Sequence, residues 1–255
     1  VTVATITSVS TPVYPGEPVT VTLTVSQGDV LLNVTLANSN TSPMYVWASQ
    51  AVYAAQPGTY VVTLTLPKEL PGLSSPPKLW VLVYFGNTPQ SNVSVDIYPK
   101  IEVSPPKTTN VNEYGVGRFI MVSGYGFDYG AKVSAIVFDN LNYPGTVYRY
   151  PVNITVGPYG NFSTPILLTR IANGEGLAGG SYNVTVTASG VTYIDYLKNA
   201  TLEILPQAII NASPNPPIIE PNSGAGRVYA HGRCDTSVCE YNYVNVSLYG
   251  FPPSS

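Results

Sequence analysis

Charged side chains are scarce in this 255-residue sequence. They make up 10% of it, against about 25% in an average soluble domain. Lys and Arg stand singly, with no basic stripe, and the formal net charge is −3. Phosphate binding requires clustered cations, so we expect neither nucleic acid nor an anionic lipid surface as a partner. No apolar run approaches the roughly 18 residues that a spanning helix requires, so we expect no membrane insertion by this chain.

The residues of common catalytic sites are also scarce. His231 is the only histidine, and no G-x-S-x-G sequence is present to form the nucleophile turn of a hydrolase. No pattern marks a pair of glycosidase carboxylates. The glycines of Gly124-Tyr125-Gly126 precede neither a helix nor a phosphate-binding lysine, so they indicate turns. We therefore predict that the protein is not an enzyme and uses no cofactor and no metal.

Only two cysteines occur, Cys234 and Cys239, separated by four residues. This spacing fits a bridge across a tight hairpin, and a single such pair beside one histidine makes a poor zinc site. We predict a disulfide between them, with free thiols and a metal site as alternatives. A loop this short contributes about 2 kcal/mol by chain entropy. A disulfide implies an oxidising compartment, so we expect an extracellular or cell-surface protein. The sequence begins at Val1 rather than Met, which indicates a removed signal peptide or a fragment.

The abundant residues indicate β-structure. Runs of alternating apolar and hydroxyl residues are typical of strands with one buried face, and they recur at 18–25, 59–66 and 181–187. Turn sequences rich in Pro and Gly bound these runs, and 24 Pro and 22 Gly leave no room for long helices. No segment has a 3.6-residue period, although a helical turn near 66–70 is compatible with the sequence. The fold class is predicted to be all-β.

An internal repeat predicts the domain boundaries. Residues 95–105 resemble residues 202–214, and each segment places a proline joint between two strand-like runs. The two joints lie one immunoglobulin-like sandwich apart. We therefore predict tandem immunoglobulin-like β-sandwiches at 1–99 and 100–206, followed by a partial β unit at 207–255. Linkers are nearly absent, so neighbouring domains should be stiffly coupled.

A second internal repeat predicts that the third unit is incomplete. Ser123-Gly124-Tyr125-Gly126-Phe127 resembles Ser247-Leu248-Tyr249-Gly250-Phe251, and the first of these closes the second strand of its domain. The third unit would then hold only its opening strands, and such a small sheet is marginal alone. Further domains could follow it, it could fold back on the middle domain, or another molecule could supply its missing strands. The last strand alternates, and its apolar face could add to a neighbour's sheet through Val244, Val246 and Leu248. The opening run 1–6 could do the same, although it also fits a first strand.

N-glycosylation sequons are the strongest functional signal. Nine of the 19 asparagines stand in Asn-X-Ser/Thr, and they are spread from end to end. Within alternating runs the asparagine falls on the polar, outward face, as a sugar requires. We predict glycans at Asn33, Asn40, Asn92, Asn153, Asn161, Asn183, Asn199, Asn211 and Asn245.

The proline joints, the Gly-Tyr-Gly-Phe strand end and the dense sequons resemble those of archaeal cell-surface β-sandwich proteins. These include S-layer glycoproteins and the subunits of extracellular threads and bundling pili. The resemblance implies N-glycans and, for filament subunits, polymerisation by donor-strand complementation. Our leading expectation is therefore a glycosylated filament subunit, a head-to-tail homopolymer that works in adhesion or biofilm. The alternatives are an S-layer or surface-protein fragment, a carbohydrate- or protein-binding module with Trp47 as its platform, and a hydrolase.

Overall fold

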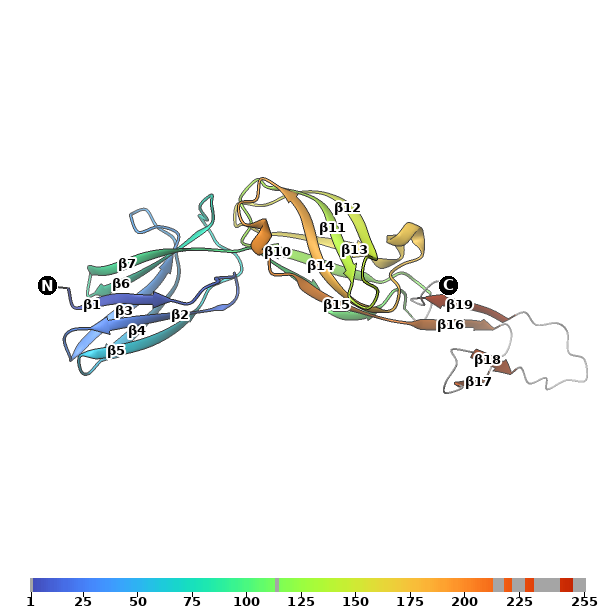
Figure 1. Cartoon of the computed structure of the whole chain (residues 1–255), viewed down its shortest axis with the longest axis horizontal. Helices are drawn as coiled ribbons and strands as arrows, with labels where there is room; N and C mark the ends of the chain where they lie inside the picture. Colours follow the sequence, from blue (N-terminus) through green and yellow to red (C-terminus); the bar gives the residue numbers. More distant parts are fainter. Residues whose placement is uncertain (1, 113–114, 213–217, 222–227, 232–243, 250–255) are drawn as a thin grey trace, which may run out of the picture. The chain divides into compact units, whose positions relative to one another are not determined.

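A computed structural model describes residues 2–112, 115–212, 218–221, 228–231 and 244–249 (Figure 1). Its side chains are described through Gln207, except that of residue 173. Strands hold 58% of the chain and short helical turns 4%, so the prediction of an all-β fold is confirmed. The described helical turns are 3₁₀ turns at η1 (Leu168–Arg170), η2 (Ala172–Gly174) and η3 (Ile194–Tyr196), and the segment at 66–70 is not helical.

Alternation of side chains explains how these strands bury one face. In β2 (Pro18–Val25) the apolar residues Val19, Val21, Leu23 and Val25 are at most 1% exposed, while the threonines between them face outward. In β14 (Gly180–Ser189) the same period buries Tyr182 and Val184. A period of two places alternate residues on opposite faces of a sheet, so each strand contributes one row to a core.

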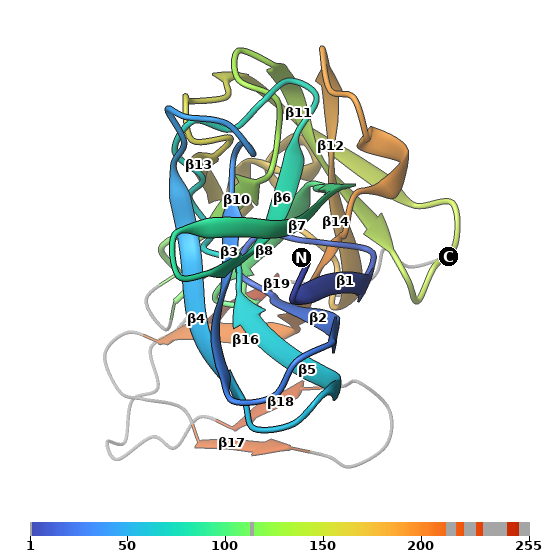
Figure 2. The ribbon, with the colours of Figure 1, turned by 90° about the vertical axis from the view of Figure 1, so that its left-hand side faces the viewer.

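The first sandwich consists of two sheets, with strand orders β1-β2-β5 and β4-β3-β6-β7. In Figure 2 the strands of this sandwich, in blue to green, lie nearest the viewer. Every pair of neighbouring strands in these two sheets is antiparallel. Buried side chains of both sheets form one core, including Leu23, Leu32 and Val81. The other strands are β1 (Ala4–Val9), β3 (Val30–Ala37), β4 (Val46–Ala54), β5 (Gly58–Thr65), β6 (Lys78–Phe85) and β7 (Thr88–Asp96).

The second sandwich has the same order of strands. Its sheets are β13-β10-β8 and β12-β11-β14-β15-β9. Relative to the first sandwich, one strand is added, because β9 pairs in parallel with β15 at the sheet edge. The fully buried Phe127, Ile136, Phe138 and Tyr182 show where its core lies. Its other strands are β8 (Lys100–Ser104), β9 (Lys107–Thr109), β10 (Phe119–Tyr125), β11 (Lys132–Asn140), β12 (Val147–Thr155), β13 (Phe162–Leu167) and β15 (Ala200–Leu205).

Beyond Pro206 the described residues form two strand pairs. β16 (Gln207–Ala212) pairs antiparallel with β19 (Val244–Tyr249), and β17 (Ile218–Pro221) pairs antiparallel with β18 (Val228–His231). The repeated sequence has a repeated register. Tyr125 lies opposite Lys100, one residue after the first joint, and Tyr249 lies opposite Gln207, one residue after the second. The two internal repeats in the sequence therefore mark equivalent strand pairs, β8–β10 and β16–β19.

The chain divides into two compact units. The larger comprises Val1–Pro106, Ile120–Ile166 and Ser181–Leu202, and the smaller comprises Lys107–Phe119, Leu167–Gly180 and Glu203–Ser255. The domain boundaries proposed from the proline joints remain a prediction. In the part of the chain that the structure describes, no helix is both long and apolar enough to cross a membrane.

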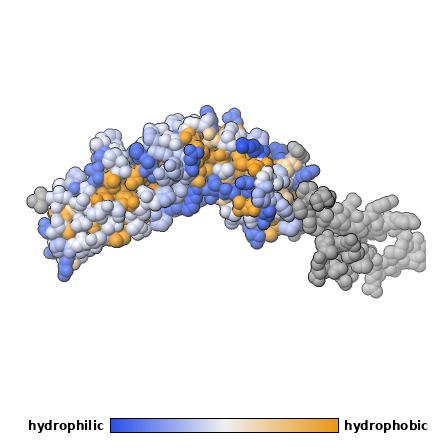
Figure 3. Space-filling model, viewed as in Figure 1, coloured by the Kyte–Doolittle hydropathy of each residue, from blue (hydrophilic) through white to orange (hydrophobic). Residues whose placement is uncertain are grey.

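The surface reflects the low charge of the sequence. In the view of Figure 3, pale residues of intermediate hydropathy cover much of the molecule, with strongly hydrophilic and hydrophobic residues interspersed. Threonine on the outward rows of the strands accounts for part of this surface, as in β2 and β5.

Candidate functional site: the joint and the sequon asparagines

The two sandwiches follow one another without a linker, and both sides of this joint lie in the larger compact unit. The Tyr98 amide donates to the Val13 carbonyl of the first sandwich at 2.9 Å. In the second sandwich, the Lys198 amide donates to the Pro99 carbonyl at 2.9 Å, and the Ile101 amide donates to the Lys198 carbonyl at 2.8 Å. The backbone passes from one ladder to the next within three residues, so little chain is left to act as a hinge.

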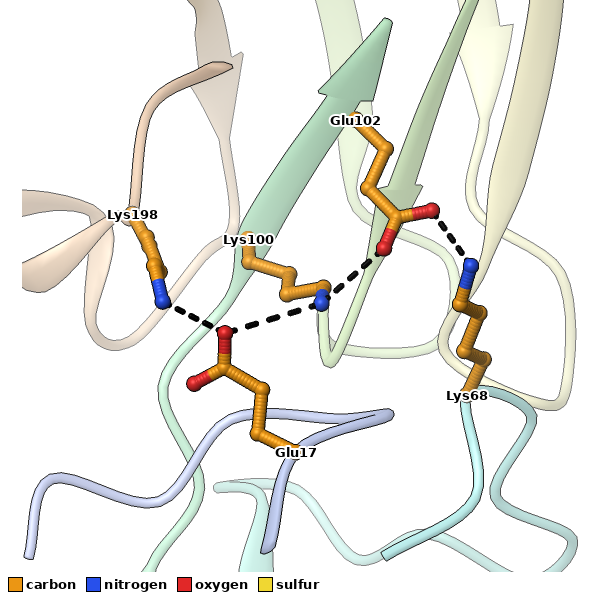
Figure 4. Close-up of polar contacts among 5 residues, drawn as sticks. All are labelled: Glu17, Lys68, Lys100, Glu102 and Lys198. Atoms are coloured by element: carbon orange, nitrogen blue, oxygen red, sulfur yellow. Dashed lines mark hydrogen bonds and ion pairs between the residues drawn. The ribbon is translucent and has the colours of Figure 1, made fainter. Parts of the chain in front are cut away.

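A cluster of five charged side chains occupies the joint (Figure 4). Lys100 lies at its centre with a side chain only 10% exposed, and its Nζ is 2.9 Å from Glu102 Oε1 and 3.8 Å from Glu17 Oε1. Lys68 Nζ is 2.6 Å from Glu102 Oε2, and Lys198 Nζ pairs with Glu17. Glu17 and Lys68 come from turns of the first sandwich, whereas the others belong to the second. A buried ammonium requires such carboxylate partners, because desolvation of an unpaired charge is costly.

The ionisation of these groups follows from the contacts. Burial alone would raise the pKa of Glu102, but hydrogen bonds from Lys68 and Lys100 outweigh it, and the pKa of Glu102 is lowered. The hydrogen bond to Glu102 raises the pKa of Lys68. Both groups are therefore held in their charged forms around neutral pH.

An aromatic cluster lies beside the charges. The Tyr98 ring stacks on that of Tyr196 at a centroid distance of 4.9 Å, meets Tyr193 edge-on at 5.3 Å and approaches Tyr14 at 6.2 Å. Lys198 Nζ lies 5.2 Å from the centre of the Tyr14 ring. Burial and a hydrogen bond to Asp96 raise the pKa of Tyr193 to about 12, so this hydroxyl keeps its proton and donates. Such pairs contribute beyond the apolar area they bury.

A buried aspartate adds a third set of contacts between the sandwiches. Asp128 is 3% exposed and accepts a hydrogen bond from Ser75 Oγ of the first sandwich at 3.0 Å. It also accepts from the Thr192 amide at 2.7 Å and from Thr192 Oγ1 at 3.0 Å, both in the second. At Gly126, with a φ of 75°, a Cβ atom would lie 2.9 Å from Pro15, so a larger residue would clash across the joint. These contacts connect the two sandwiches directly at the joint.

The described sequon asparagines differ in exposure. Asn161 and Asn183 are half-buried, and Asn161 Nδ2 donates to Glu69 at 3.1 Å. Asn211 and Asn245 lie opposite each other in the β16–β19 pair, and their side chains are outside the described residues. The remaining predicted sites have exposed side chains: Asn33, Asn40, Asn92, Asn153 and Asn199.

The residues predicted to form the disulfide and to exchange strands all lie beyond Pro206. Cys234 and Cys239 lie outside the described residues, so their disulfide remains a prediction. His231 ends β18, and its side chain is also outside that description. Val244, Val246 and Leu248 lie opposite Ala212, Ile210 and Ala208 of the same chain. Among the described residues no group of three or more His, Cys, Asp or Glu is arranged to hold a metal ion.

The surface gives limited support to a ligand-binding platform at Trp47. Its side chain is half-buried against the first core, and its Nε1 donates to the Pro71 carbonyl at 3.0 Å. A shallow hollow of about 290 Å³ in the same sandwich is lined by residues including Asn33, Met44 and Tyr84, and Trp47 is not one of its lining residues. A glycan on Asn33 would cover this hollow.

The sequence does not predict the charged joint. Glu17, Lys68, Lys100, Glu102 and Lys198 belong to no motif in the sequence. A signal was nevertheless present, because in a chain with 10% charged residues Lys100 and Glu102 stand directly after a proline joint. Sequence alone gives no indication that residues 17 and 68 meet them.

Comparisons with known proteins add little. No family model matches the chain, and no curated protein matches it. Among solved structures, it is similar to a red sea bream transglutaminase, with 13% identity, 80% of this chain and 32% of that one covered, and a TM-score of 0.29. It is also similar to a β-glycosidase from Bacteroides vulgatus, with 13% identity, 79% and 25% covered, and a TM-score of 0.24. The chain thus spans about a third and a quarter of these structures, and scores this low support no inference about activity.

Proposed function

We propose that this protein is a structural subunit of a glycosylated extracellular filament that functions in adhesion or biofilm. The observation that carries the proposal is the linkerless joint, in which a buried lysine, a tyrosine cluster and a buried aspartate connect successive sandwiches. Charged residues are few in this chain, and those at the joint fix the spacing of its domains. Such a fixed spacing suits a subunit of a filament.

The exposed sequon asparagines support the extracellular part of the proposal. Five predicted sites have exposed side chains in a chain with little surface charge. Covalent sugar would supply the hydration that charged side chains supply in an ordinary soluble domain.

We further propose that subunits join head to tail by strand exchange at the β16–β19 pair. Within one chain, β19 pairs with the whole of β16. The pairing runs from Ala212 opposite Val244 to Gln207 opposite Tyr249. The same ladder can form between copies, with β19 of one subunit beside β16 of the next. Such a contact joins two different surfaces, so it propagates into a fibre instead of closing into a dimer.

Negative-stain imaging of native material tests the filament. Fibres are expected, a two-dimensional lattice would favour the alternative of an S-layer protein, and discrete monomers in light scattering would refute assembly.

Val246→Pro tests strand exchange, because proline removes a ladder donor in the middle of β19. It should abolish fibres while Trp47 and Trp80 still report a folded first sandwich. Asn245→Asp is the control, since it removes a sequon and keeps the strand; fibres that persist in the proline variant would contradict exchange through β19.

A further inference from the structure

The sequons within strands are confined to one sheet of each sandwich. Asn33 lies in β3 and Asn92 in β7 of the first sandwich, and Asn153 lies in β12 and Asn183 in β14 of the second. All four strands belong to the larger sheets. Their flanking residues point inward, as the buried Leu32 and Val34 on either side of Asn33 show. Glycans at these positions would therefore cover the outer faces of the larger sheets.

The opposite sheet of the first sandwich, β1-β2-β5, has a different composition. Its strands contain no charged residue and no asparagine. The outward rows are almost entirely threonine: Thr20 lies opposite Thr63, Thr22 opposite Val61, and Thr24 opposite Thr59. Val61 lies among these hydroxyls and is 66% exposed. We call this outer surface the threonine face, defined by Thr5, Thr20, Thr22, Thr24, Thr59, Val61, Thr63 and Thr65.

The chemistry of the threonine face suits contact with a second copy of itself. A hydroxyl both donates and accepts, as Thr20 Oγ1 and Thr63 Oγ1 do at 3.2 Å, so an array of hydroxyls is complementary to its own copy. A face without charge does not repel that copy. Threonine is stiff at χ1, so ordering its side chain on contact costs little entropy.

The size of the face indicates when the contact forms. β2 and β5 have eight residues each and β1 has six, so the face covers roughly 350 Å², which is less than half of the ~800 Å² per partner of a standard stable interface. Two free copies should therefore associate weakly. In an assembly the same contact recurs along the fibre, and many weak contacts held at fixed spacing add up.

We propose that the threonine face is the surface through which assembled copies of this chain contact one another side by side, while glycans keep the larger sheets apart. This inference rests on the proposed function, since it needs subunits that assemble. It specifies a second partner surface, separate from strand exchange at β19.

A glycan placed on the face tests the inference. Val61→Asn creates a sequon at an exposed position, because Val62 and Thr63 follow it, and adding Thr63→Ala removes the sequon but keeps the introduced amide. The control on the opposite sheet is Thr185→Asn, which moves the sequon from Asn183 to position 185 of β14. All variants are made in a host that glycosylates the wild-type chain, their occupancy is measured by intact mass, and assemblies are imaged in negative stain.

V61N should give fibres that no longer associate side by side, whereas T185N and V61N/T63A should behave like the wild type. V61E is a second variant that needs no glycosylation, and its like charges should separate the fibres at low salt and allow association at high salt. Side-by-side association that persists in both occupied V61N and V61E would overturn the inference. A wild-type chain that forms no fibres would overturn the proposed function, and this inference with it.

Discussion

Replacement of Lys100 by methionine tests whether the joint couples the two sandwiches. Methionine keeps most of the aliphatic stem and removes the ammonium that contacts Glu102 at 2.9 Å and Glu17 at 3.8 Å. A hydrogen bond to a charged group contributes about 1.5–3 kcal/mol net. The carboxylates of Glu102 and Glu17 are 33% and 28% exposed, and they keep Lys68 and Lys198 as partners. The larger free-energy cost of leaving a buried charge without a partner therefore does not apply in full. We expect a loss of about 2 kcal/mol in the free energy of unfolding.

The assay uses the positions of the two tryptophans. Trp47 lies in β4 and Trp80 in β6, so their fluorescence reports the first sandwich, whereas Lys100 belongs to β8 of the second. With a urea dependence of about 2 kcal/mol per M, the tryptophan-detected midpoint should fall by about 1 M. The control Lys198→Met removes a lysine whose side chain is 49% exposed and should cost at most about 1 kcal/mol.

The pH dependence gives an independent check. The pKa of Glu102 is lowered from its ordinary value of 4.5, so its pairing contributes stability above that value and loses it as the pH falls through the lowered pKa. The difference between wild type and K100M should therefore be full at pH 7 and shrink once the pH is below 4.5. An unchanged midpoint at pH 7, or a difference of equal size in acid, would refute the coupling role of Lys100.

Three other contacts give predictions of their own. Asp128→Ala removes the acceptor of three hydrogen bonds at a site 3% exposed and should cost about 2–4 kcal/mol in urea unfolding, against about 0.5 kcal/mol or less for the exposed control Glu175→Ala. Glycopeptide mapping should find Asn33 occupied and Asn161 unoccupied, since Asn161 is half-buried and bonded to Glu69; full occupancy of Asn161 would contradict this assignment. Burial raises the pKa of Tyr182 to about 12, so its proton stabilises the folded state and stability should fall as the pH rises above the ordinary value of 10; an ultraviolet titration in which every tyrosine ionises near pH 10 would be inconsistent with that burial.

Local patterns in the sequence predicted the strands well. The alternating runs at 18–25 and 181–187 coincide with β2 and lie within β14, because a period of two is decided by neighbouring residues. The segment Ser123–Phe127 resembles Ser247–Phe251, and this repeat marked the equivalent strand pairs β8–β10 and β16–β19. The two strand pairs have the same register, so the repeated residues occupy equivalent positions.

Contacts between distant segments could not be predicted from one sequence. Lys100 meets Glu17 only because a turn of the first sandwich reaches the first strand of the second. Asn161 resembles any other sequon in the sequence, and its hydrogen bond to Glu69, 92 residues away, could not be read from it. The threonine face was visible as alternation in two separate runs, but the pairing of β2 with β5 was needed to make one surface of them.

The parallel pairing of β9 with β15 has a mechanical consequence. Glu203, Ile204 and Leu205 lie opposite Lys107, Thr108 and Thr109, and in the first sandwich Val13 makes a parallel bridge with Ile97. When two parallel strands are pulled from the start of one and the end of the other, they slide past each other, and their hydrogen bonds bear the force together. An antiparallel hairpin pulled at its open ends instead unzips one bond at a time. Each sandwich therefore joins its entering and leaving segments in the geometry that resists stretching, as the proposed filament would require.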